Sequence, residues 1–169
     1  MKNNNLLKIG IPVVLVLVII VVLGFRAGSQ LMWYGFDEGI QKAKDEKKQV
    51  LIDVYTDWCS WCKVMDEKTY TDPRIVEYLD TKFILIKLNP EKDGPVTFNG
   101  KSYDADHFAQ GIGVNGYPAT AFFESNEKMI TLVPGYLKAD EFLPILEYIG
   151  EKRYNDIGFE DFLKQRQKN

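Results

Sequence analysis

Cys59 and Cys62 are the only two cysteines in the 169-residue chain, and Ser60 and Trp61 separate them. They follow the apolar stretch 50–55 and stand at the start of a segment whose pattern predicts a helix. The free N–H groups and the dipole of a first helical turn stabilise the thiolate, which is the form of cysteine that attacks disulfides. A second thiol three residues later can resolve the resulting mixed disulfide. The spacing therefore predicts a redox-active dithiol.

The two cysteines are expected to differ in role. Cys59, at the helix start, should be the nucleophile, because the thiolate is favoured there. Cys62, one turn further along, should be the resolving thiol. A structural disulfide is the weaker alternative, since so small a loop restrains little of the unfolded chain and a protein of this size can build a core without it.

The charge pattern separates an N-terminal segment from the rest of the chain. Residues 9–25 are uncharged and largely apolar, with Lys2 and Lys8 before them and Arg26 after them. Without these three basic residues the remaining chain has a net charge of about −6. That charge argues against nucleic acid as a partner, and against adhesion of the folded part to anionic lipid.

Residues 9–25 support two interpretations. Their length of about 17 residues is at the lower limit for a membrane-spanning helix and exceeds a typical signal-peptide core. One interpretation, which we favour, is an uncleaved membrane anchor. The other is a cleaved signal peptide that ends at residues 27–29. The lysines before residues 9–25 favour a cytoplasmic N-terminus. We expect an anchor or signal region at 1–29, a tether at 30–35, and one domain at 36–169. That domain would be membrane-anchored facing the periplasm or another extracytoplasmic space, or secreted to the periplasm.

The order of the predicted elements indicates an α/β fold. Helical spacing and capping signals predict helices at residues 36–48, 59–70, 73 onward, 104–110, 139–149 and 159–167. Apolar runs predict strands at residues 50–55, 83–88, 119–123 and 128–133, and a hairpin at 96–103 around Asn99-Gly100. A helical crossover followed by a hairpin gives a mixed sheet of about four strands, covered by helices on both faces.

Asp53 is an acid in the middle of the apolar stretch 50–55. An unpaired buried carboxylate is costly, so Asp53 either faces solvent or has a task. The functional interpretation is a proton acceptor for Cys62, because desolvation would raise the pKa of the carboxyl toward neutrality. Lys87, near the end of the second predicted strand, looks solvated when it is considered by itself.

Several segments together resemble the thioredoxin superfamily. Residues 53–63 are similar to its active-site signature, with an acid six residues before the first cysteine, a tryptophan directly before that cysteine and a lysine after the second. Residues 87–89 resemble the end of the family's second strand, and residues 113–118 resemble the segment that ends in its cis-proline. Gly135 stands where the family has a glycine after its last strand. The matches extend over residues 36–149 and imply a thioredoxin-like fold.

The resemblance also implies roles for individual residues. It places Lys87 opposite the buried acid Asp53. It implies that the Tyr117–Pro118 peptide bond is cis and that this turn faces the cysteines, where the backbone before the proline pairs with the substrate chain. Tyr117 and Pro118 are then substrate-binding residues.

Two tryptophans and one histidine have their own interpretations. Trp61 is hard to bury between the cysteines and is expected to contact partners, whereas Trp58 either joins this surface or packs on the domain. His107, the only histidine, is interpreted as an exposed helix residue. A zinc site that joined it to the two cysteines would lack the usual fourth ligand.

Two features differ from thioredoxin itself. The dipeptide Ser60-Trp61 replaces Gly-Pro between the cysteines, and the stretch 90–110 is longer. Together with the N-terminal segment, these differences make the chain more similar to exported or membrane-anchored thioredoxin-like proteins. That group includes the exported domain of the transmembrane disulfide reductases.

These observations predict a thiol–disulfide oxidoreductase that exchanges electrons with protein thiols and disulfides outside the cytoplasm, without a bound cofactor or metal. The resemblance favours a reductant that receives electrons from a membrane disulfide reductase. A disulfide oxidase or isomerase is the alternative within the same chemistry. A thioredoxin-fold binding module for a membrane or assembly partner is the alternative from another class, and metal delivery is the weakest.

Overall fold

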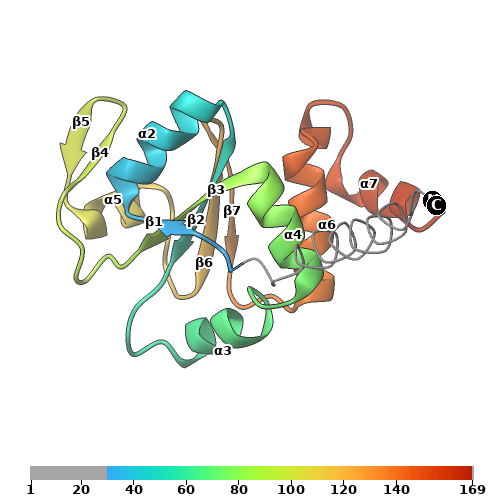
Figure 1. Cartoon of the computed structure of the whole chain (residues 1–169), viewed down its shortest axis with the longest axis horizontal. Coiled ribbons are helices and arrows are strands. Elements are labelled where there is room, and N and C mark those ends of the chain that lie inside the picture. Colours follow the sequence, from blue (N-terminus) through green and yellow to red (C-terminus); the bar gives the residue numbers. More distant parts are fainter. Residues whose placement is uncertain (1–29, 169) are drawn as a thin grey trace, which may run out of the picture.

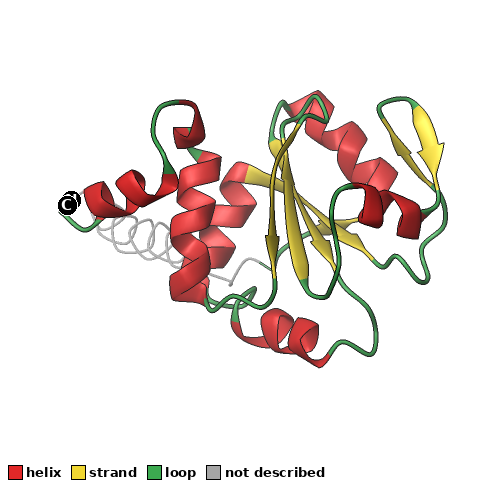
Figure 2. Ribbon diagram, turned by 180° about the vertical axis from the view of Figure 1, so that it is seen from behind, coloured by secondary structure: helices red, strands yellow, loops and turns green. Residues whose placement is uncertain are grey.

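A five-stranded sheet lies at the centre of residues 30–168, the part of the chain that the computed structural model describes (Figures 1 and 2). The strand order is β1 (Trp33–Tyr34), β3 (Phe83–Leu88), β2 (Gln49–Val54), β6 (Ala119–Phe123) and β7 (Met129–Pro134). Strands β1, β3 and β2 are parallel, whereas β6 and β7 are each antiparallel to the preceding neighbour. The expected mixed sheet is confirmed, with one strand more than the sequence predicts.

Helices cover both faces of this sheet (Figure 1). One face packs against α2 (Phe36–Glu46) and α5 (Ala105–Gly111). The other packs against α3 (Ser60–Lys68), α4 (Pro73–Lys82) and α6 (Ala139–Gly150). The chain continues after α6 into the short helix η1 (Arg153–Asn155) and then α7 (Phe159–Arg166).

The alternation of side chains along the central strands decides which face carries the polar residues. Leu51 of β2 and Leu85 of β3 belong to the apolar cluster on the side of α3, α4 and α6. Asp53 and Lys87 each stand two positions further along the same strands, so they point to that same side. The acid and the lysine therefore face the helix that begins at the cysteine motif.

Short local signals predict the outlying elements correctly. The hairpin of β4 (Val96–Phe98) and β5 (Lys101–Tyr103) turns at Asn99 and Gly100, whose φ angles of 49° and 71° are both positive. An Asn-Gly pair favours this turn because both residues tolerate the left-handed region. At the start of α4, the Asp72 carboxylate accepts a hydrogen bond from the backbone N–H of Arg74 at 2.9 Å, and Pro73 occupies the first turn.

Strand β1 lies in the stretch that we expected to be a tether. Trp33 pairs with Leu85 and Tyr34 with Ile86, and Leu31 just before them is buried. A strand of two residues has no alternation pattern to recognise, so its pairing depends on the free edge that β3 offers. The two aromatic residues therefore pack on the domain.

The predicted anchor or signal at residues 9–25 lies outside the described residues. Within residues 30–168, no helix combines the length and the apolar character needed to cross a membrane.

Candidate active site

The cysteine pair lies where the loop after β2 enters α3. Cys59 is the N-terminal capping residue of α3, and its Sγ accepts a hydrogen bond from the backbone N–H of Cys62 at 3.1 Å. The two sulfur atoms are joined in a disulfide, and their Cα atoms are 5.3 Å apart. Both cysteines are buried. A sulfur that faces a backbone N–H at a helix start is in the environment that stabilises a thiolate once the disulfide is reduced.

A buried ion pair lies on the α3 side of the sheet. Asp53 has 2% of its surface exposed and stands opposite Lys87 in the register of β2 and β3. The Lys87 ammonium donates hydrogen bonds to Asp53 Oδ2 and to Oδ1 of Asp66, which lies on α3. The Lys87 side chain itself is 22% exposed. Asp53 is therefore paired inside the fold and is not a solvated surface acid.

Burial and the attraction between the opposite charges act in opposite directions on the pKa of each member of this pair. Loss of water raises the pKa of the Asp53 carboxyl above its ordinary value, and the Lys87 ammonium opposes that rise. Burial alone would lower the pKa of Lys87, but the carboxylates of Asp53 and Asp66 outweigh it and the pKa is raised. Asp53 Oδ1 has no hydrogen-bond partner among the described residues. The carboxyl can therefore accept a proton at Oδ1 while Oδ2 holds the lysine.

Two exposed tryptophans flank the disulfide. Trp58 is 67% exposed, its indole N–H donates to Glu91 Oε2 at 2.9 Å, and its ring meets that of Tyr117 edge to face at 5.8 Å between centroids. Trp61 is 58% exposed and stacks on Tyr136 at 5.2 Å between centroids. Trp58 thus stands at the surface and also packs on the domain through Glu91 and Tyr117, so it combines the two alternatives that the sequence left open.

The turn before β6 adjoins the loop that carries the first cysteine. The Tyr117–Pro118 peptide bond is cis, as the resemblance implies. The Pro118 carbonyl accepts a hydrogen bond from the backbone N–H of Gly135 at 2.8 Å, which ties the turn to the end of β7. The Tyr117 ring contacts Trp58, the residue directly before Cys59. The turn and the cysteine loop therefore share one surface.

The thioredoxin-like domain family matches residues 36–150 of this chain. The chain belongs to the thioredoxin-like family. It is 31% identical over 98 residues to the thiol:disulfide interchange protein DsbD of Haemophilus ducreyi, a match that covers 57% of this chain and 16% of DsbD. The bonded Cys59–Cys62 pair thus stands on a thioredoxin-like domain that is similar in sequence to a part of DsbD.

Solved structures of other thioredoxin-like proteins have the same fold. A thioredoxin from Thermus thermophilus superposes with a TM-score of 0.60 at 18% identity, over 72% of this chain and 88% of that one. The reduced C-terminal domain of DsbD from Neisseria meningitidis superposes with a TM-score of 0.50 at 23% identity, over 64% of this chain and 88% of that one. These likenesses concern the fold alone.

His107 lies on α5, apart from the thioredoxin-like dithiol. It is exposed, and its Nδ1 is 3.2 Å from Asp104 Oδ2. Among residues 30–168, the group of acidic, histidine and cysteine side chains that stands close enough to share a metal ion consists of Asp104, Asp106 and His107. The two cysteines do not belong to this group, which is a solvent-exposed acidic cluster.

The sequence interpretation missed three side chains that contact the expected site residues. Asp66 binds Lys87, Glu91 binds the Trp58 indole, and Tyr70 lies buried beside Asp53 and Lys87. A usable signal existed only for Asp66, which stands four residues after Cys62 and so shares its helix face. The other two contacts join segments that are distant in sequence.

Proposed function

We propose that this protein is a disulfide reductase that works outside the cytoplasm on protein cysteines. The observation that carries the proposal is the Cys59–Cys62 disulfide at the start of α3, on the side of the sheet where the buried Asp53–Lys87 pair lies. A reactive sulfur and a buried acid that can hold a proton are the two groups that a dithiol exchange needs.

The proposed reaction has two steps. The reduced Cys59 thiolate attacks a sulfur of the substrate disulfide, which forms a mixed disulfide and releases one substrate thiolate. Asp53 then accepts the proton of the Cys62 thiol, and the Cys62 sulfur attacks Cys59 Sγ, which releases the second substrate thiolate. The substrate disulfide gains two electrons, and the two protein thiols become a disulfide.

The direction of electron flow and the location rest on similarity and on the N-terminal sequence. The relative DsbD is named a thiol:disulfide interchange protein, which supports exchange with other proteins. The apolar residues 9–25, preceded by lysines, support a membrane anchor with the domain on the extracytoplasmic side, and a cleaved signal would place it in the periplasm. We propose a membrane disulfide reductase as the electron donor.

A redox titration tests the direction. The full-length protein is equilibrated in glutathione and dithiothreitol buffers of known potential, and the fraction of reduced Cys59 and Cys62 is measured by alkylation and mass spectrometry. We expect a reduction potential well below that of the glutathione couple, since only then does the dithiol donate electrons efficiently. A potential above the glutathione couple would instead make the protein an oxidase or isomerase.

The exposed tryptophans supply the surface on which a protein substrate docks. Trp58 and Trp61 keep large apolar faces in water, and aromatic residues of this kind dominate the energetics of many interfaces. The same observation favours the second candidate function, a binding module in which the fold presents Trp58, Trp61 and Tyr117 to a partner and turnover is incidental.

Replacing Trp61 with alanine is expected to raise KM for a protein disulfide about tenfold, because truncation of an interface tryptophan costs about 1–2 kcal/mol. The rate with a small aromatic disulfide, which cannot span the surface, should stay within about twofold. Tyr103→Ala on the distant hairpin, which also removes an exposed aromatic ring, serves as the control. Equal losses with both substrates would show that Trp61 supports the cysteines and does not bind the partner.

A further inference from the structure

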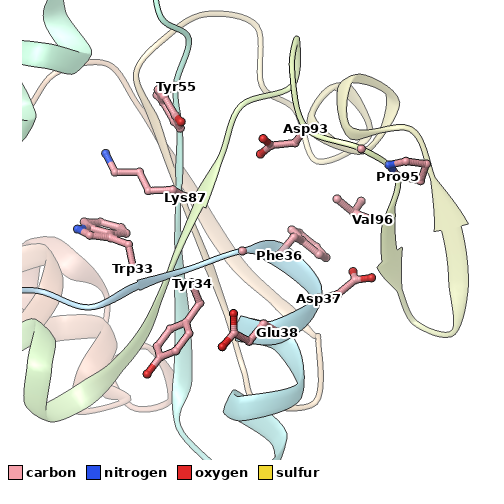
Figure 3. A pocket seen from close by; sticks show the side chains of 12 residues that line it. Trp33, Tyr34, Phe36, Asp37, Glu38, Tyr55, Lys87, Asp93, Pro95 and Val96 are labelled. Carbon is pink, nitrogen blue, oxygen red and sulfur yellow. The ribbon is translucent and has the colours of Figure 1, made fainter.

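Three aromatic rings surround the Lys87 ammonium. The nitrogen lies 4.7 Å from the ring centroid of Trp33, 5.1 Å from that of Tyr55 and 5.3 Å from that of Tyr70. Figure 3 shows the lysine side chain between Trp33 and Tyr55, while Tyr34 points away from it. All three distances are within the range in which a cation is attracted to the face of a ring. We call Trp33, Tyr55 and Tyr70 the aromatic cage.

The cage is assembled from three separate parts of the fold. Trp33 is in β1, Tyr55 directly follows β2, and Tyr70 follows α3. Trp33 pairs with Leu85, two residues before Lys87 on β3, so the indole and the lysine stand on the same side of the sheet. The rings of Trp33 and Tyr70 also meet edge to face at 4.9 Å between centroids. The position of the lysine therefore depends on strand β1.

The aromatic cage stabilises the lysine ammonium without neutralising its positive charge. Aromatic rings attract the cation but carry no net charge, so they offset lost hydration without competing as proton acceptors. The cage therefore keeps the ammonium in place while its charge pairs with the carboxylates of Asp53 and Asp66. The other charged or titratable groups that act on this cluster from the surrounding elements are Asp57, Asp93, Tyr55 and Tyr70.

We propose that Trp33 is a positioning residue for the thiol–disulfide exchange, because its indole holds the Lys87 ammonium against Asp53. The inference rests on the proposed function, in which Asp53 accepts the proton of Cys62. It assigns a redox task to β1, the strand that directly precedes α2 at the edge of the sheet.

The direction of the expected effect follows from the two influences on Asp53. Burial raises its pKa and Lys87 opposes the rise. Asp53 is on the central strand β2, which β3 and β6 flank, so the carboxyl stays covered when the Trp33 side chain is shortened. A lysine released toward water would therefore no longer oppose the effect of burial, and Asp53 would ionise only at higher pH.

The test measures how the resolving step depends on pH. A peptide disulfide is mixed with the reduced full-length protein, and release of the second peptide thiol is followed by acid quenching and alkylation. We expect Trp33→Leu to move the midpoint of the pH profile upward by about one unit, and Trp33→Phe to restore most of it. Tyr55→Leu should shift the midpoint in the same direction. Tyr34→Leu, on the same strand but facing away from the lysine, should leave it unchanged.

A double-mutant cycle with Lys87→Met separates a positioning role from a structural one. If Trp33 acts through the lysine, Trp33→Leu adds no further shift when Lys87 is already methionine. The positioning role of Trp33 would be overturned if Trp33→Leu shifted the midpoint equally in the wild-type and Lys87→Met backgrounds. It would also be overturned if Trp33→Leu caused no shift in the wild-type background while Lys87→Met did. In both cases the role of Asp53 would stand. If neither Lys87→Met nor Asp53→Asn alters the profile, proton transfer through Asp53 fails, and the inference fails with it.

Discussion

Replacing Cys59 with serine is expected to lower the rate of disulfide reduction by at least about 10³-fold, because a serine hydroxyl neither ionises near neutral pH nor forms a disulfide. The measurement is the reduction of insulin by dithiothreitol with the full-length protein as catalyst. The fold should be unaffected, since Cys59 caps α3 through its sulfur and serine is itself a preferred capping residue.

Cys62→Ser is the matched variant, and its expected behaviour differs. Cys59 can still attack, but nothing resolves the product, so a mixed disulfide with the substrate should accumulate and be visible by mass spectrometry. The same pair of variants separates the enzyme from the binding module. A cell in which Cys59→Ser supports normal function would show that turnover is incidental and that docking on Trp58 and Trp61 is the task.

Replacing Asp53 with asparagine is expected to slow the resolving step by about 10²-fold or more at neutral pH, because the amide cannot accept the proton of Cys62. The first attack by Cys59 should be little changed. The two steps are separated by quenching the reaction with acid at successive times and measuring how the mixed disulfide forms and decays. Asparagine has nearly the same shape as aspartate, so the backbone of β2 and its pairing with β3 and β6 should persist.

The same substitution is expected to change how the stability of the fold depends on pH. The pKa of Asp53 is raised in the folded state by burial, so its favourable contribution is present below the unfolded value of about 3.9 and is lost as the pH rises through the folded value. Asparagine has no such loss. Urea unfolding should therefore give a larger gain for Asp53→Asn at pH 8 than at pH 4. The control is Asp156→Asn, an exposed acid in the C-terminal part. A slower enzyme whose stability relative to the wild type is the same at pH 8 and at pH 4 would mean that Asp53 is not held at a desolvation cost.

The amino-acid sequence determined the parts of this protein that depend on neighbouring residues. The order of helices and strands follows from apolar runs and helical spacing. The cysteine motif stands at a helix start, Asn99-Gly100 turns a hairpin, and Asp72-Pro73 begins a helix, because each of these depends on the backbone preferences of a few adjacent residues. A single buried acid in an apolar strand was also enough to point to Asp53.

Only the tertiary structure decided how segments distant in sequence meet. Strand β1 forms because β3 leaves an edge free, and two residues carry too little pattern to predict it. Lys87 looks solvated by itself, yet the fold places it between Asp53, Asp66 and the ring of Trp33. Trp58 is exposed because Glu91 and Tyr117, from two other loops, hold it at the surface beside the cysteines. Each of these contacts depends on chain packing across the sheet, and no local rule of sequence encodes it.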